Sequence, residues 1–181
     1  MGYFLLQIVS MDPIMKVEIE PHMRYELGKT LYSIESLRDW FLIRRMFVDP
    51  MTNLVIKNGD LANLIKKMKE KDYFPDVNVR HMSLYRVFCI FEKYNNLRVL
   101  VNKQRESLGE LSNKIDIKKE KMAKSMKRKN GENAVNNYQK QIDRLKLKVN
   151  KINEKKDILE NRFWDDVKLL LNSRKNRIEI V

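Results

Sequence analysis

Two stretches decide the fold: LRVLVNKQRESLGELSNKIDIKKEKM at residues 97–122 and YQKQIDRLKLKVNKINEKKDILENRF at residues 138–163. In each stretch, mostly apolar residues recur at alternating steps of four and three, which is the spacing of a coiled-coil seam. The first seam comprises Leu97, Val101, Gln104, Leu108, Leu111, Ile115, Lys118 and Met122. The second seam comprises Tyr138, Ile142, Leu145, Val149, Ile152, Lys156, Leu159 and Phe163.

The two seams are mirror images of each other about Asn130-Gly131. If the chain reverses there, Leu97 faces Phe163. Every other residue of the first seam then also faces a residue of the second seam that lies equally far from the reversal in the sequence. Asn and Gly tolerate the left-handed backbone angles that a tight reversal needs. We therefore expect an antiparallel coiled-coil hairpin. Two helices of a compact bundle remain the alternative.

The two seams share one polar interruption, and the first seam has a second one of its own. Gln104 falls opposite Lys156, and Lys118 falls opposite Ile142. A polar pair in a seam lowers stability but selects one alignment of the helices. Gln104 and Lys156 are therefore expected to fix the register.

Composition separates this hairpin from the preceding chain. All four prolines lie within residues 11–80, and residues 82–175 contain none. The turn at residues 73–76 marks the boundary between the two modules. The expected division is an N-terminal extension at 1–11, an α+β module at 12–80, a helical hairpin at 82–175 with helices at about 82–127 and 134–173 and a turn at 129–133, and a C-terminal tail at 176–181. The fold class is mainly α.

The first module contains short elements. Ser33 is a suitable N-cap for an amphipathic helix that carries Leu37 and Trp40. Residues 17–20 alternate like a strand, residues 54–56 suggest another short strand, and Asp60 is expected to cap a helix over residues 61–69. An apolar stripe then begins the hairpin and is expected to pack on this module; it comprises Leu84, Val87, Phe88, Phe91 and Tyr94.

The order of these elements, together with several short motifs, resembles a U-box, the zinc-free relative of the RING domain. The resemblance covers residues 12–69. It rests on Asp12-Pro13-Ile14, on Gly28, Thr30 and Tyr32, on Ile34, Leu37 and Trp40, on Asp49-Pro50-Met51-Thr52, and on Leu61, Leu64, Ile65 and Met68. The chain is also similar to the degenerate U-box-like modules of large DNA virus proteins.

The resemblance implies a surface for a ubiquitin-conjugating enzyme, formed by Ile14, Trp40 and Pro50. Asn53 stands where the family often carries an Arg or Lys that steadies the charged ubiquitin. A ligase of this class aligns its partners and needs no catalytic side chain.

The residue inventory argues against self-contained catalysis. Cys89 is the only cysteine, which excludes an intramolecular disulfide and a thiolate zinc site. His22 and His81 form no recognisable metal or nucleophile set with it, and no glycine-rich phosphate loop is present. No cofactor, metal or catalytic residue is expected. No apolar stretch is long enough to span a membrane.

The chain carries a formal net charge of +13, which suggests an acidic partner. The basic charge is concentrated at the predicted hairpin tip, in Lys118, Lys119, Lys121, Lys124, Lys127, Arg128 and Lys129. Such a cluster can bind phosphate backbones without reading sequence. A merely solvated charged surface is the alternative.

Three functions are therefore considered. The first is a non-enzymatic scaffold that docks neighbouring proteins in a large assembly, such as a viral particle in which it is a minor capsid protein, through the U-box-like head and the basic arm. The second is a U-box-type ubiquitin ligase, and the third is sequence-independent nucleic-acid binding by the tip. A reducing compartment is expected, cytoplasmic or nuclear, or the interior of a virion.

Overall fold

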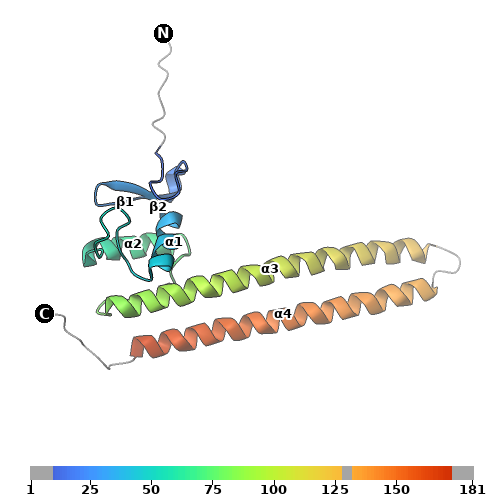
Figure 1. Ribbon diagram of the computed structural model, residues 1–181. Coiled ribbons are helices and arrows are strands. Elements are labelled where there is room, and N and C mark those ends of the chain that lie inside the picture. The colour runs from blue at the N-terminus through green and yellow to red at the C-terminus, as the bar shows by residue number, and fades with distance from the viewer. Residues whose placement is uncertain (1–9, 128–131, 173–181) are drawn as a thin grey trace, which may run out of the picture. The chain divides into compact units, whose positions relative to one another are not determined.

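The computed structural model describes residues 10–127 and 132–172 (Figure 1). Helices dominate this part of the chain, beside a single two-stranded sheet. The expected fold class is confirmed: a small α+β head is followed by a long antiparallel helical hairpin. The predicted reversal at Asn130-Gly131 lies outside the described residues.

The chain divides into two compact units. The head unit comprises residues 10–95 and 170–172 of the described chain, and the hairpin unit comprises residues 96–169. No helix in the described residues is long and apolar enough to cross a bilayer.

The head unit begins with loops and a small β-hairpin. A 3₁₀ turn, η1 (Pro21–Met23), leads into strands β1 (Arg24–Leu27) and β2 (Thr30–Ser33). The strands pair antiparallel, with Arg24 opposite Ser33 and Leu27 opposite Thr30. Gly28 has a φ of 63° in the two-residue turn between them, a conformation that glycine adopts without steric cost.

The two short strands expected outside this hairpin are absent. Residues 17–20 contribute only the bridge between Met11 and Glu18, and residues 54–56 only the bridge between Val48 and Val55. Both expectations were wrong for the same reason. Each segment closes a tight turn and pairs only briefly, before η1 begins at Pro21 in one case and a helix at Asn58 in the other.

Helix α1 (Ile34–Arg44) begins as predicted, because the Ser33 side chain accepts a hydrogen bond from the Glu35 amide at 3.3 Å. Helix α2 (Asn58–Glu70) begins earlier than expected. Its N-cap is Lys57, whose carbonyl accepts from the Leu61 amide at 2.8 Å. Asp60 therefore lies in the first turn, where its charge favours the helix dipole, and it is not the cap.

Phenylalanine side chains form the core of the head unit. Phe41 and Phe47, at and just after the end of α1, lie with their ring centroids 5.2 Å apart. Phe88 and Phe91, from the start of α3 (Leu84–Met126), place their rings 5.6 Å and 5.4 Å from Phe47. Phe74 stacks on Phe91 at 6.4 Å. The prediction that the apolar stripe at the start of the hairpin packs on the first module is thus confirmed.

The hairpin unit consists of the remainder of α3 and most of α4 (Glu132–Asn172), which run antiparallel (Figure 1). Every residue of the two predicted seams is buried or half-buried, whereas most residues between the seam positions are exposed. This rhythm follows from the 3.5-residue spacing, which turns one stripe of each helix towards its partner. Val101, Ile142 and Phe163 are the most deeply buried seam residues.

The expected polar pair in the seam is not formed through the Gln104 amide oxygen. That Oε1 atom is buried and has no hydrogen-bond partner among the described residues. Lys156 instead places its Nζ 3.6 Å from Glu160 Oε1 on its own helix. A buried acceptor without a partner costs roughly 1–3 kcal/mol.

Replacing Gln104 with leucine is therefore expected to stabilise the hairpin by about 1–2 kcal/mol, because the unpaired amide is exchanged for apolar volume in the seam. Urea unfolding followed by the far-ultraviolet helical signal measures the change. Asn102→Leu, at an exposed position of the same helix, controls for the added leucine. A lower unfolding midpoint for Gln104→Leu would contradict this expectation.

Candidate protein-docking site

The head unit contains the same loop twice. The first copy spans residues 10–19 and contains Asp12-Pro13-Ile14-Met15. The second spans residues 47–56 and contains Asp49-Pro50-Met51-Thr52. We call them the twin loops.

The backbone hydrogen bonds of the twin loops match position by position. The Asp12 amide donates to the Val17 carbonyl at 2.8 Å, and the Asp49 amide donates to the Leu54 carbonyl at 2.9 Å. The carbonyls of the two aspartates each accept, at 2.9 Å, from the amide four residues later. Ile19 donates to Ser10 at 2.8 Å, and Ile56 donates to Phe47 at 3.0 Å.

The aspartate side chains hold the turns closed. Asp12 Oδ1 accepts from the Ile14 and Met15 amides at 2.8 and 2.9 Å. Asp49 Oδ1 accepts from the Met51 and Thr52 amides at 2.7 and 3.1 Å. A carboxylate that accepts amides two and three residues ahead fixes a turn without a metal ion.

Each loop then passes through a left-handed residue at the same position. Lys16 and Asn53 both have a φ of 57°. Asparagine adopts this conformation more readily than most residues. The conformation gives Asn53 a backbone role that the sequence alone did not reveal.

Two adjacent residues at the end of β2 anchor the twin loops. The Ser33 amide donates to Asp12 Oδ2 at 2.6 Å, and the Tyr32 hydroxyl donates to Asp49 Oδ1 at 3.3 Å. Burial, and then the neighbouring Asp49 carboxylate, raises the pKa of Tyr32 to about 12, so the phenol stays protonated and able to donate. One short strand thereby sets the positions of both loops.

The second loop is also tied to α1. Trp40 Nε1 donates to the Val48 carbonyl at 3.1 Å, and the Arg44 guanidinium lies 4.5 Å from the centre of the indole ring. Ile14, Trp40 and Pro50, the three residues implied by the U-box resemblance, are all half-buried. The indole nitrogen is therefore engaged, while part of the ring remains accessible.

The twin loops carry exposed apolar side chains that the sequence reading did not single out. Met51 and Leu54 are 65% and 68% exposed, and Met15, Val17 and Val55 are more than half exposed. We call these five side chains the twin-loop surface. The repeated Asp-Pro in the printed sequence was the signal that could have identified both loops together. Methionine is over-represented at protein-binding surfaces, so these exposed side chains make the twin loops a candidate docking site.

Comparisons with protein-family models, curated proteins and solved structures find no match. No group of three or more His, Cys, Asp or Glu side chains that could hold a metal occurs in residues 10–127 and 132–172.

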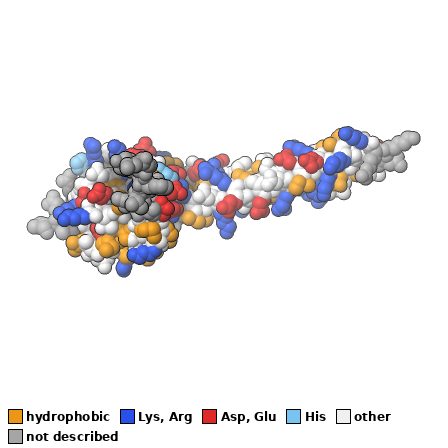
Figure 2. Space-filling model, turned by 90° about the horizontal axis from the view of Figure 1, so that it is seen from above, with side chains coloured by type: hydrophobic (Ala, Val, Ile, Leu, Met, Phe, Trp, Pro, Cys, Tyr) orange, Lys and Arg blue, Asp and Glu red, His pale blue; other side chains and the backbone are white. Residues whose placement is uncertain are grey.

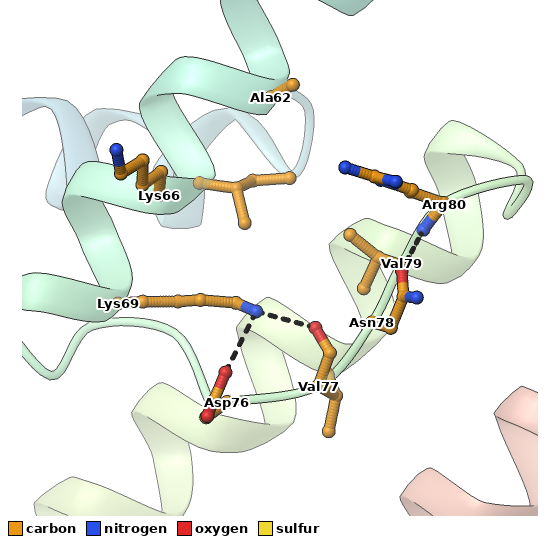
Figure 3. A pocket seen from close by; sticks show the side chains of 9 residues that line it. Ala62, Lys66, Lys69, Asp76, Val77, Asn78, Val79 and Arg80 are labelled. Atoms are coloured by element: carbon orange, nitrogen blue, oxygen red, sulfur yellow. Dashed lines mark hydrogen bonds and ion pairs between the residues drawn. The ribbon is translucent and has the colours of Figure 1, made fainter.

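A groove of about 450 Å³ lies elsewhere in the head unit, between α2 and residues 76–80 (Figure 3). The Lys69 side chain reaches across the groove. Its Nζ donates to the Val77 carbonyl at 2.7 Å and lies 3.2 Å from Asp76 Oδ1. Asn78 Oδ1 accepts from the Arg80 amide at 3.0 Å. The Lys69 contacts join residues 76–77 to α2, and the Asn78 side chain closes a turn within the segment.

The basic tip is described only in part. Lys119, Lys121, Lys124 and Lys127 are exposed, whereas Arg128 and Lys129 lie outside the described residues. Lys118 is half-buried, with its Nζ 5.7 Å from the centre of the Tyr138 ring. Lys119 Nζ lies 3.2 Å from Asp116 Oδ1. The charges of the tip are thus mostly open to solvent.

Proposed function

We propose that this chain is a non-enzymatic scaffold protein that docks a partner protein through the twin-loop surface of its head unit. The observation that carries the proposal is the duplicated loop. Two turns are fixed by aspartate side chains, and each offers apolar side chains to solvent. A preorganised apolar surface loses little conformational entropy on binding, which favours affinity.

Two variants that each introduce two negative charges test this proposal. Met51→Glu with Leu54→Glu places two carboxylates on the second loop, while Ala62→Glu with Asn63→Glu makes the same charge change at exposed positions of α2. Each variant and the unmodified chain are used to capture proteins from the source cells or particles. A partner is then purified and its affinity measured by calorimetry.

The expected result is a partner that binds the unmodified chain and the α2 variant equally. Its affinity for the loop variant falls at least tenfold, because a carboxylate is desolvated against an apolar surface without a counterion. Equal affinity of a purified partner for all three proteins would rule out the twin-loop surface as its docking site.

A U-box-type ubiquitin ligase is the second candidate, favoured by the position of Trp40 beside the second loop. The Trp40 indole donates a hydrogen bond to the carbonyl of Val48, which belongs to the same loop as Pro50. An autoubiquitination assay with a panel of conjugating enzymes tests this candidate. Activity that is lost in Ile14→Ala and Pro50→Ala would support it, and absence of activity with every enzyme would leave docking alone.

A further inference from the structure

The hairpin unit has further basic residues on α4, and they extend the basic charge beyond the tip. Between residues 133 and 153 the sequence has five basic residues, Lys140, Arg144, Lys146, Lys148 and Lys151, against Asp143 alone. Figure 2 views the hairpin from the side of α3; on that face Lys and Arg side chains are interspersed with Asp and Glu and predominate only near the turn end.

Part of this surface is hollowed. A groove of about 430 Å³ is lined by Lys118 of α3 and, on α4, by Gln141, Arg144, Leu145, Leu147, Lys148 and Lys151. Arg144, Lys148 and Lys151 follow one another by four and three residues. They therefore share one side of the helix, at intervals of about 6 and about 4.5 Å along its axis.

The three α4 cations that line the groove lack acidic partners in the described part of the chain. None of Arg144, Lys148 and Lys151 has a carboxylate oxygen within salt-bridge distance in the described part of the chain. The nearby Asp143 accepts instead from Gln139 Nε2 at 2.9 Å. Several unpaired cations along one groove repel each other, and an anion bound there would relieve that repulsion.

The geometry points to the phosphate backbone of a nucleic acid as the ligand of this groove. A linear polyanion matches charges set in a row along a helix, and each neutralised phosphate releases counterions. The contact is independent of nucleotide sequence, because bases stack on free aromatic faces and this part of the hairpin offers none. Tyr138 is the only aromatic residue between residues 97 and 162, and Lys118 lies over its ring.

This inference does not rest on the docking function of the head unit. The groove lies entirely in the hairpin unit, so either proposal can fail without the other. It also differs from binding by the tip, because it assigns the main contacts to Arg144, Lys148 and Lys151 on α4.

Fluorescence anisotropy of the full chain with a 30-nucleotide single-stranded RNA and a 30-base-pair DNA duplex tests the inference. The groove variant combines Arg144→Gln, Lys148→Gln and Lys151→Gln. The matched control combines Lys103→Gln, Arg105→Gln and Lys155→Gln, which removes the same charge from exposed positions outside the groove. Far-ultraviolet circular dichroism verifies that all three proteins remain helical.

At 100 mM salt, the groove variant is expected to bind at least one of the two nucleic acids tenfold or more weakly, and the control less than threefold. The slope of log K against log salt should fall in magnitude by about 2–3 in the groove variant, because each lost phosphate contact removes about 0.7–0.9. An equal loss of nucleic-acid affinity in the groove variant and the control would show that affinity depends on net charge alone. That result would overturn the assignment.

Absence of binding to either nucleic acid at 50 mM salt would also overturn it. Sedimentation with phosphatidylcholine vesicles containing 30% phosphatidylserine distinguishes an anionic membrane from a nucleic acid. If the groove variant lost vesicle binding but kept its affinity for RNA and DNA, the groove would be a lipid site and the inference would be wrong.

Discussion

Replacing Asp12 with alanine is expected to lower the free energy of unfolding of the head unit by about 3–5 kcal/mol. The side chain is fully buried and accepts three backbone hydrogen bonds, from Ile14, Met15 and Ser33. Alanine leaves these three donors without their acceptor, and an unsatisfied buried donor costs roughly 1–3 kcal/mol. The first loop would also lose its connection to β2.

The twin loops supply a matched control for this change. Asp49 accepts two amides and one hydroxyl and is only half-buried, so water can replace part of what alanine removes. Asp49→Ala is therefore expected to cost about half as much as Asp12→Ala. The free energy of unfolding of Asp12→Asn should lie between those of the wild type and Asp12→Ala. The single carboxamide oxygen can still accept hydrogen bonds, whereas the NH₂ group cannot accept from the backbone donors that it faces.

Urea unfolding followed by tryptophan fluorescence measures these differences. The chain has two tryptophans, so a Trp164→Phe background makes Trp40 the sole reporter, and Trp40 lies in the head unit. A loss below 1 kcal/mol for Asp12→Ala, or a larger loss for Asp49→Ala, would show that the first loop does not depend on its carboxylate.

The hairpin was predictable from sequence because its stabilising contacts repeat. Each seam position is apolar or flanked by apolar positions over 26 residues, so the pattern survives interruptions such as Lys118 and Lys156. The apolar stripe that includes Phe88 and Phe91 was recognisable for the same reason, and it forms part of the core of the head unit.

The head unit was less predictable because its loops are held by single polar contacts across the sequence. The alternation of residues 17–20 predicted a strand, yet only one bridge forms after the turn closed by Asp12. The bonds from Ser33 to Asp12 and from Tyr32 to Asp49 span 21 and 17 residues, and no local pattern encodes them. The repeated Asp-Pro was visible, but its equivalence in structure depends on these distant partners.

Replacing Phe91 with alanine is the second large expected effect, a loss of about 3–5 kcal/mol in the stability of the head unit. Phe91 is fully buried, and its ring centroid lies 5.4 Å from Phe47, 5.9 Å from Phe88 and 6.4 Å from both Phe41 and Phe74. Alanine removes a side chain from the centre of this cluster and leaves a cavity that these rings can only partly fill.

Two further variants separate this cavity effect from a change in helix α3 itself. Phe91→Leu keeps most of the volume and should cost about 1–2 kcal/mol, less than half of the alanine effect. Tyr85 lies on the same helix but is 75% exposed, so Tyr85→Ala should leave the unfolding midpoint nearly unchanged.

The Trp40 fluorescence in the Trp164→Phe background again reports on the head unit. If Phe91→Ala shifted only the far-ultraviolet helical signal and left the Trp40 transition in place, Phe91 would stabilise α3 but not the core of the head unit. The loss is expected in the Trp40 transition, because the side chain of Phe91 is surrounded by rings from α1 and the loops of that unit.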